Sequence, residues 1–292
     1  MPTGRAIARR LRAAARATRT PAPAPAAGPT IALDYPFTPV ARWGFGPPPH
    51  PELDALIGAG RERYHATLMS FLPHVDALTA IPLDAEGTGP GWANGWFGGV
   101  DAAALYCFLA QRAPATYLEI GAGNSTRFAR RAITDHGLPT RIVSIDPTPR
   151  ASLEGLSDEH RTTPLEQTDL AVFDAITAND VVILDGSHRT FTGSDVTVFF
   201  LEVLPRLPSG VLVYVDDVFL PWDYPPQIAD RWYSEQYLLA SWLLAGDRLE
   251  VTLPGFWITR EPELHQILTP LWQHLTWAGV AINGTGFWFT VR

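Results

Sequence analysis

The sequence contains no lysine, and its 22 basic residues are all arginine. Reactions that use a lysine as a base or as a Schiff-base nucleophile are therefore excluded. There is a single cysteine, Cys107, which cannot form an internal disulfide or a cysteine-rich zinc site. This scarcity of cysteine excludes a secreted disulfide framework and a zinc finger, and it predicts a reducing, cytoplasmic compartment.

Long apolar runs are missing too. The best candidate, residues 237–246, is interrupted by Ser241 and falls short of the roughly 20 residues that cross a bilayer. Charge is distributed unevenly, because residues 1–33 hold six arginines and no acid, whereas the rest of the chain holds 16 arginines and 30 acids. Such an acidic body repels nucleic acid. We therefore expect neither a membrane nor a nucleic acid as partner.

The chain is long enough for one large core. It has 292 residues, of which 46% are hydrophobic. A typical domain has about 100–200 residues, so we expect one large domain with at most a small additional segment. We expect a flexible basic arm with a Pro/Ala linker over residues 1–33, a cap of helices and loops over 34–99, and the main domain over 100–292. The arm lacks the apolar stretch of about 7–15 residues that a signal peptide has, so export is not expected.

Short β-branched runs alternate with helix-length segments after residue 100, a pattern typical of a parallel sheet covered on both faces. The predicted strands are residues 116–120, 141–145, 181–184 and 211–215, with a weaker one at 161–164. The predicted helices are residues 125–134, 170–176, 194–207 and 231–245, with further helical structure at 51–75. Residues 248–253 and 286–291 flank a helix at 262–277 and fit an antiparallel pair at one sheet edge. We therefore predict an α/β, doubly wound, Rossmann-like fold.

The strongest motif is YLEIGAGNST at residues 117–126, a strand that runs into a glycine turn and then a helix. Glycines at the carboxyl end of a first strand let a cofactor approach the backbone, so Gly121 and Gly123 are candidate cofactor contacts. The motif departs from the dinucleotide fingerprint, because Thr126 occupies the third glycine position. Glu119, two residues before the first glycine, suits a cationic or amine-bearing cofactor better than a pyrophosphate.

An acid follows the next predicted strand. Asp146 lies 23 residues after Gly123, where a carboxylate can accept hydrogen bonds from the hydroxyls of a ribose. Asn124 or Ser125 is expected to cap the following helix, whose N-terminus favours the carboxylate of a cofactor. The structural alternatives are a capping role for Asp146 and a surface or capping role for Glu119.

With these residues the sequence resembles the class I S-adenosylmethionine-dependent methyltransferases, whose first motif is acid-x-Gly-x-Gly and whose second strand ends in an acid. The resemblance covers residues 100–292. It implies a seven-stranded, mostly parallel sheet with an antiparallel last strand and helices on both faces. It also implies that S-adenosyl-L-methionine is the cofactor, held by Glu119, Gly121, Gly123 and Asp146.

Carboxylates also follow the next two predicted strands, at Asp185 and at Asp216 and Asp217. Carboxylates crowded at neighbouring strand ends repel one another unless they are protonated or bridged by a cation, and Mg²⁺ would relieve that repulsion. The arrangement resembles the metal-dependent O-methyltransferases of the catechol and macrolide-sugar types. It predicts a metal site at these three aspartates, with the alternative that one of the adjacent pair only caps the next turn. Asp185 is also a candidate cofactor ligand.

His188 lies three residues after Asp185, where the catechol-type enzymes carry a lysine that acts as general base. A neutral histidine can accept a hydroxyl proton near neutral pH. We therefore predict His188 and Asp185 as catalytic residues, with a hydrogen bond from His188 to a loop carbonyl as the structural alternative. Asp217 also departs from the catechol-type pattern, which has asparagine there.

Residues 185–225 look like a bacterial group of small class I methyltransferases that often lie among sugar, polyketide or other natural-product genes. Many of its members have His-Asp where this chain has Asp216-Asp217. The aromatic residues in 219–226 predict a stiff loop over the acceptor site. We expect residues 92–97, with Trp92, Asn94, Trp96 and Phe97, to close the opposite side; core packing is the alternative for these aromatics.

The sequence thus predicts a cytoplasmic O-methyltransferase for a hydroxyl of a small-molecule acceptor, such as a sugar or another natural product. Metal assistance and homo-oligomerisation are left open. One alternative is a metal-dependent hydroxylase or lyase on the same scaffold, which a site with one histidine among carboxylates matches poorly. Another is a non-catalytic cofactor-binding protein. A nicotinamide dehydrogenase ranks last because its pyrophosphate fingerprint is incomplete.

Overall fold

The structure is a computed structural model that describes residues 34–150 and 152–292. The basic arm and linker predicted for residues 1–33 lie outside this part of the chain. Two compact units are distinguished, residues 1–39 and residues 40–292, and every helix and strand named below belongs to the second. Within the described ranges, no helix combines the length and the hydrophobicity that crossing a bilayer requires.

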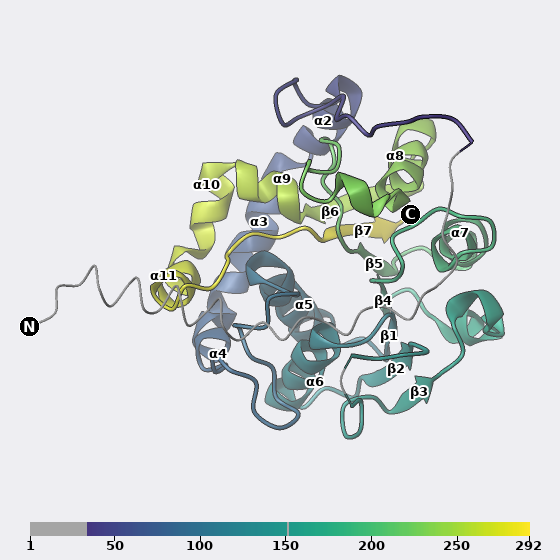
Figure 1. Cartoon of the computed structure of the whole chain (residues 1–292). Helices are drawn as coiled ribbons and strands as arrows, with labels where there is room; N and C mark the ends of the chain where they lie inside the picture. The colour runs from purple at the N-terminus through teal and green to yellow at the C-terminus, as the bar shows by residue number, and fades with distance from the viewer. Residues whose placement is uncertain (1–33, 151) are drawn as a thin grey trace, which may run out of the picture. The chain divides into compact units, whose positions relative to one another are not determined.

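A seven-stranded sheet forms the centre of this unit (Figure 1). Its strands are β1 (Thr116–Ile120), β2 (Arg141–Ile145), β3 (Glu159–Arg161), β4 (Val181–Leu184), β5 (Leu212–Val215), β6 (Leu249–Pro254) and β7 (Phe287–Val291). They lie in the order β3-β2-β1-β4-β5-β7-β6. Strands β1 to β5 pair in parallel, and β7 runs antiparallel to both of its neighbours. The predicted mostly parallel sheet with an antiparallel last strand is confirmed.

Helices cover both faces of the sheet, which explains why its central strands are apolar along their length. Figure 1 shows α5 (Gly99–Arg112) and α6 (Asn124–His136) on one side, with α7 (Asp195–Val198) and α8 (Glu235–Ala245) on the other. Between these layers every residue of β4 is at most 1% exposed. A strand without a polar face fits in such a buried position. The polar residues that follow its carboxyl end then lie at the edge of the sheet.

Three strands have the predicted bounds, and four differ, of which β6 and β7 begin a single residue later than the predicted 248–253 and 286–291. The fifth strand begins one residue later than expected, at Leu212. The third lies at Glu159–Arg161 instead of residues 161–164, because Pro164 has no amide hydrogen for a strand ladder and leads into a 3-10 turn at Leu165–Gln167.

The helix predictions are less accurate. Residues 194–207 form α7, a π-helical turn at Phe199–Val203 and a 3-10 turn at Leu204–Arg206, because Pro205 cannot donate to an α-helical ladder. The predicted helix at 170–176 is a 3-10 helix, Leu170–Ala175. The predicted helix at 231–245 begins at Glu235 as α8, since Trp232 has a left-handed φ of 59°.

The helices before the sheet share its hydrophobic core. The segment predicted as helical at 51–75 contains α2 (Pro51–Gly58), α3 (Arg61–Phe71) and the start of α4 (Val75–Thr79). Side chains from α3, such as Phe71, are buried in the same cluster as strand residues of β7. The remaining helices are α9 (Gly255–Arg260), α10 (Pro262–His265) and α11 (Thr269–Trp277). Residues 40–99 therefore fold in the same compact unit as the sheet.

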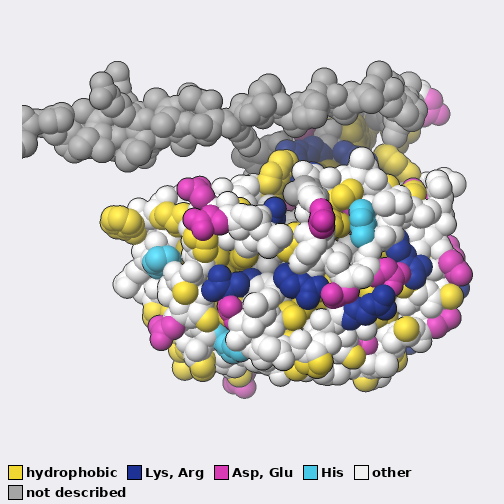
Figure 2. Space-filling model, turned by 90° about the horizontal axis from the view of Figure 1, so that it is seen from below, with side chains coloured by type: hydrophobic (Ala, Val, Ile, Leu, Met, Phe, Trp, Pro, Cys, Tyr) yellow, Lys and Arg dark blue, Asp and Glu magenta, His cyan; other side chains and the backbone are white. Residues whose placement is uncertain are grey.

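The surface carries charges of both signs. Figure 2 shows one face, on which arginine and acidic side chains are interspersed instead of gathered by sign. Several arginines pair with acids, as Arg130 does with Asp158 at 2.7 Å and Arg141 with Glu159 at 2.6 Å. Such exposed pairs contribute little to stability.

Candidate active site

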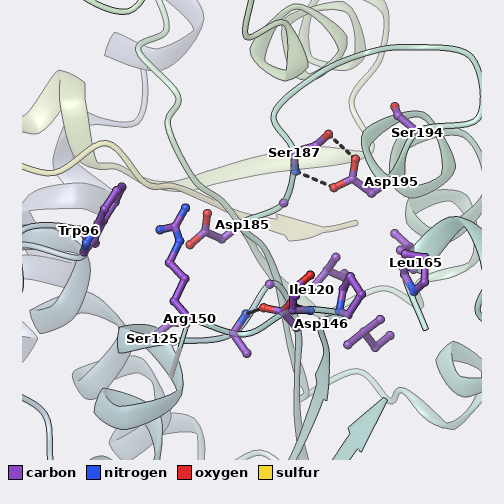
Figure 3. Close-up of a pocket in the computed structure, with 18 of the residues that line it drawn as sticks. Trp96, Ile120, Ser125, Asp146, Arg150, Leu165, Asp185, Ser187, Ser194 and Asp195 are labelled. Carbon is purple, nitrogen blue, oxygen red and sulfur yellow. Dashed lines mark hydrogen bonds between the residues drawn. The ribbon is translucent and has the colours of Figure 1, made fainter. Parts of the chain in front are cut away.

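A cavity of about 800 Å³ opens at the carboxyl ends of β1, β2 and β4. Figure 3 shows its lining, with Asp146 at its floor and Asp185 and Arg150 facing its interior. Six of the seven residues predicted to bind the cofactor line it: Gly121, Gly123, Asn124, Ser125, Asp146 and Asp185. The seventh, Glu119, does not. The topology therefore brings the motifs after three different strands to one cavity.

The first glycine of the turn is required by its surroundings. Gly121 has a left-handed φ of 83°, and a Cβ at this position would lie 1.8 Å from the carbonyl oxygen of Asp185. Its amide donates to the carbonyl oxygen of Ile145 at 3.0 Å. The turn is thus held between the neighbouring strand ends, with its backbone forming part of the cavity wall.

Asp146 fixes the same turn from the second strand. Its carboxylate accepts the amide of Ala122 at 2.9 Å through Oδ2 and the amide of Thr148 at 2.8 Å through Oδ1. The side chain is half-buried and lines the cavity. Each carboxylate oxygen has a second lone pair, so Asp146 can also accept a hydroxyl from a bound ligand.

Glu119 lies beneath the turn and is fully buried. Its carboxylate accepts hydrogen bonds from four hydroxyls, those of Tyr117, Ser125, Thr126 and Ser144. Burial raises its pKa to about 7, although these hydrogen bonds oppose the shift. The direct cofactor contact predicted for Glu119 stays a prediction. The hydrogen bonds that Glu119 makes connect β1, β2 and α6.

His188 lies at the centre of a group of carboxylates beside the cavity. Its Nε2 is 3.5 Å from Oδ1 of Asp185 and 3.9 Å from Oδ2 of Asp217, and its Nδ1 is 2.6 Å from Oε1 of Glu235. Both His188 and Asp217 have left-handed backbones, with φ of 61° and 51°. Such conformations in residues other than glycine are uncommon and concentrate at functional sites.

The charge state of this group follows from its neighbours. Burial alone would lower the pKa of His188, but the charge and hydrogen bond of Glu235, with the charges of Asp185 and Asp217, raise it well above the usual value of 6.5. Burial likewise raises the pKa of Glu235 to about 7, against the influence of His188. The histidine therefore supplies the positive charge that balances these acids.

The metal site predicted at Asp185, Asp216 and Asp217 stays a prediction, and these aspartates have other contacts in the structure. Asp216 is buried, and its carboxylate accepts the hydroxyl of Tyr214. His188 Nε2 lies within 4.0 Å of carboxylate oxygens of both Asp185 and Asp217. Within residues 34–150 and 152–292, no group of three histidine, cysteine, aspartate or glutamate side chains is arranged to hold a metal ion. The carboxylate repulsion that suggested a cation in the sequence is relieved here by the histidine.

Glu235 is the important residue that the sequence analysis missed. It is the first residue of α8 and is fully buried, and its Oε2 has no hydrogen-bond partner among the described residues. The amide of Ser234 donates to the carbonyl of His188 at 2.8 Å, which ties the start of α8 to the histidine loop. The two residues are 47 positions apart, so no local spacing signals the pair.

The aromatic residues predicted near the acceptor divide into two groups. Trp92 is core, with its indole donating to the carbonyl of Leu78, whereas Trp96 and Phe97 line the cavity. Asn94 fixes that loop through hydrogen bonds with residues 91–97. On the other side Tyr233 packs on His188, with ring centroids 4.5 Å apart.

Residues 118–218 match the family model of a methyltransferase domain. A search of curated proteins gives no match. Similar solved structures include a methyltransferase from Podospora anserina, PaMTH1, bound to S-adenosylhomocysteine (17% identity, 76% of this chain, 88% of that chain, TM-score 0.41). Another is a putative O-methyltransferase from Klebsiella pneumoniae (15% identity, 77% of this chain, 89% of that chain, TM-score 0.40).

The family match begins in β1 and ends just after Asp217, so it contains the glycine turn, Asp146, Asp185 and His188. The strand order around this segment is the one that the resemblance to class I methyltransferases implied, with β7 reversed. We conclude that the chain carries a methyltransferase domain, matched over residues 118–218.

Proposed function

We propose that this chain is a class I S-adenosylmethionine-dependent methyltransferase, that it transfers the methyl group to a hydroxyl of a small molecule, and that His188 is the general base. The proposal is supported above all by one observation: His188 directs Nε2 toward the aspartates at the strand ends while Glu235 holds Nδ1. A buried carboxylate that accepts Nδ1–H leaves Nε2 as the proton-accepting nitrogen. This is the arrangement of a base with an orienting group.

The cavity has the chemistry to hold the cofactor. When bound, S-adenosylmethionine supplies an activated methyl group on a sulfonium. Gly121 gives close backbone approach, Asp146 is placed for ribose hydroxyls, and Asp185 presents a carboxylate that is 40% exposed. Asn124 and Ser125 begin α6, whose N-terminal amides favour anionic groups. Glu119 supports the turn from below.

The protein's part in the reaction is then to align the acceptor and to remove its proton. The proton of the acceptor hydroxyl passes to Nε2 of His188, and the imidazolium is stabilised by Glu235, Asp185 and Asp217. A raised pKa makes the neutral imidazole a stronger base, although less of it is present at neutral pH. Asp195 accepts the amide of Ser187 at 2.7 Å, which ties the loop that carries His188 to the first residue of α7.

We assign no step to a metal ion, since the donor set does not fit one. Asp216 accepts the hydroxyl of Tyr214, and Nε2 of His188 lies 3.5 Å from Asp185 and 3.9 Å from Asp217. The alternative of a metal-dependent hydroxylase or lyase loses its support for the same reason.

A panel of matched acceptors tests the proposal. Each set holds one small molecule with a free hydroxyl, its amine analogue and its methyl ether, and formation of S-adenosylhomocysteine and of methylated product is measured by mass spectrometry. We expect methylation of hydroxyl compounds and none of the ethers. Methylation of the amines with the hydroxyls left unreacted would show that the enzyme is an N-methyltransferase.

A further inference from the structure

Three arginines line the cavity, and they differ in how their guanidinium groups are used. Arg127 donates to backbone carbonyls of residues 87 and 89 at 2.7 and 2.9 Å. Arg189 donates to backbone carbonyls of residues 187 and 231 at 2.8 and 3.1 Å. Arg150 makes no hydrogen bond or ion pair with the described part of the chain. It is therefore the arginine of this cavity that keeps all of its N–H donors available.

Arg150 is nevertheless positioned. Its Cζ lies 4.2 Å from the centroid of the Trp96 ring, and Figure 3 shows the guanidinium between Trp96 and Asp185. A guanidinium that packs on an aromatic face keeps its N–H groups free in its own plane. The indole thus orients the cation without using any of its donors.

Asp185 faces Arg150 across the same cavity. Both side chains line the cavity, and they do not form an ion pair within 4.0 Å. Burial raises the pKa of Asp185, whereas the charge of His188 and, to a smaller extent, that of Arg150 lower it. A positive and a negative side chain therefore line the same cavity without being paired to each other. An α-amino acid group carries one carboxylate and one ammonium, which are opposite in charge to Arg150 and Asp185 respectively.

We infer that Arg150 binds the carboxylate, and Asp185 the ammonium, of the amino-acid end of the cofactor. A bidentate contact between a guanidinium and a carboxylate has the geometry and strength for this. The assignment differs from the sequence prediction, which gave the carboxylate to Asn124 or Ser125. It depends on the cofactor class and not on the acceptor being a hydroxyl.

An acidic acceptor is the competing ligand for Arg150. The cofactor is favoured because Arg150 and Asp185 line the same cavity as the glycine turn and Asp146. His188 and Asp217, which we place at the acceptor, are not part of that lining. The guanidinium of Arg150 therefore lies beside the residues that we assign to the cofactor.

Binding measurements with ligands that differ at the amino-acid end test the inference. Calorimetry compares S-adenosylhomocysteine with 5′-methylthioadenosine, which lacks both the carboxylate and the ammonium. In Arg150→Gln we expect the affinity for S-adenosylhomocysteine to fall about 10- to 100-fold, with 5′-methylthioadenosine binding within about twofold of wild type. Arg206→Gln, an exposed site away from the cavity, is the control for the lost charge and should change neither value.

Trp96→Leu adds a second readout. We expect a smaller loss of S-adenosylhomocysteine affinity, of roughly two- to fivefold, and no further loss when it is combined with Arg150→Gln. The inference is overturned if Arg150→Gln binds S-adenosylhomocysteine like wild type, or if it weakens 5′-methylthioadenosine equally. Unchanged cofactor binding with a raised KM for acidic acceptors would assign Arg150 to the acceptor instead.

Discussion

Glu235 and His188 are separated by 47 residues along the chain, yet Oε1 of the one and Nδ1 of the other lie 2.6 Å apart in the interior. The contact joins the start of α8 to the loop after β4. Because Glu235 is fully buried, its charge acts on the imidazole with little screening by water. The pair explains how a single histidine can both balance nearby acids and present a basic nitrogen.

The pH dependence of catalysis should reveal this pair. His188 accepts a proton only when neutral, and its pKa is raised, so kcat/KM should rise with pH through a midpoint above 6.5. Glu235→Gln removes the charge that raises this pKa, so the midpoint should move to lower pH, while the plateau falls by about 10²-fold as the imidazole loses its orientation. Rate profiles of both proteins measure the two effects.

Glu263→Gln is the control for this experiment, because its side chain is 87% exposed and pairs with Arg61 on the surface. It should leave the profile unchanged. A Glu235→Gln profile with the wild-type midpoint would show that the carboxylate does not tune His188.

Cofactor binding should be lost when the first glycine is replaced. Gly121→Ala places a methyl group 1.8 Å from the carbonyl oxygen of Asp185, in addition to the strain of φ at 83°. Gly137→Ala is the matched control, with φ of 58° and open space around the added methyl. We expect both to lower stability by about 1 kcal/mol or more, and only Gly121→Ala to abolish binding of S-adenosylhomocysteine in calorimetry. Retained binding in Gly121→Ala would mean that this turn does not shape the site.

Glu119 should make stability depend on pH. Its pKa is about 7 in the folded protein, against 4.5 as the ordinary value. Between these values the folded state holds a proton that the unfolded state has released, so the free energy of unfolding falls as pH rises through this range. Glu119→Gln should flatten that part of the slope in denaturant titrations at several pH values. Asp247→Asn, at an exposed position, should leave the slope as it is, and an unchanged slope in Glu119→Gln would contradict the assignment.

Turnover should not depend on a divalent metal. Since His188 lies between Asp185 and Asp217, we expect the initial rate to be the same after treatment with EDTA, after dialysis, and with added Mg²⁺. A rate that falls to background with EDTA and returns with Mg²⁺ would restore the metal site predicted from the sequence.

The sheet could be predicted from sequence because its strands are short apolar runs with polar residues at both ends. The run VVIL at Val181–Leu184 favours a buried strand because it is short and rich in β-branched residues, and Asp185 then lies at its carboxyl end. The helix at residues 194–207 could not be placed as well, since Pro205 and the packing around it decide between α, π and 3-10 turns.

The site was predictable where it follows strand ends and unpredictable where it depends on tertiary contacts. Asp146 and Asp185 come from the rule that parallel strands present their carboxyl ends at one edge. Glu235 and Arg150 obey no such rule, because α8 and the loop after β2 reach the site only through packing. The metal site stays a prediction, since the sequence shows that carboxylates gather at the strand ends but not that a histidine nitrogen lies 3.5 Å from Asp185 and 3.9 Å from Asp217.

The central claim is that His188 acts on the acceptor and not on the cofactor. Asparagine tolerates the left-handed backbone at residue 188, so His188→Asn is the variant to measure, with kcat for a hydroxyl acceptor and Kd for S-adenosylhomocysteine taken on the same protein. We predict that kcat falls by about 10²–10⁴-fold, while Kd stays within about threefold of wild type. An equal loss of kcat and of affinity, or a kcat close to that of wild type, would contradict the account.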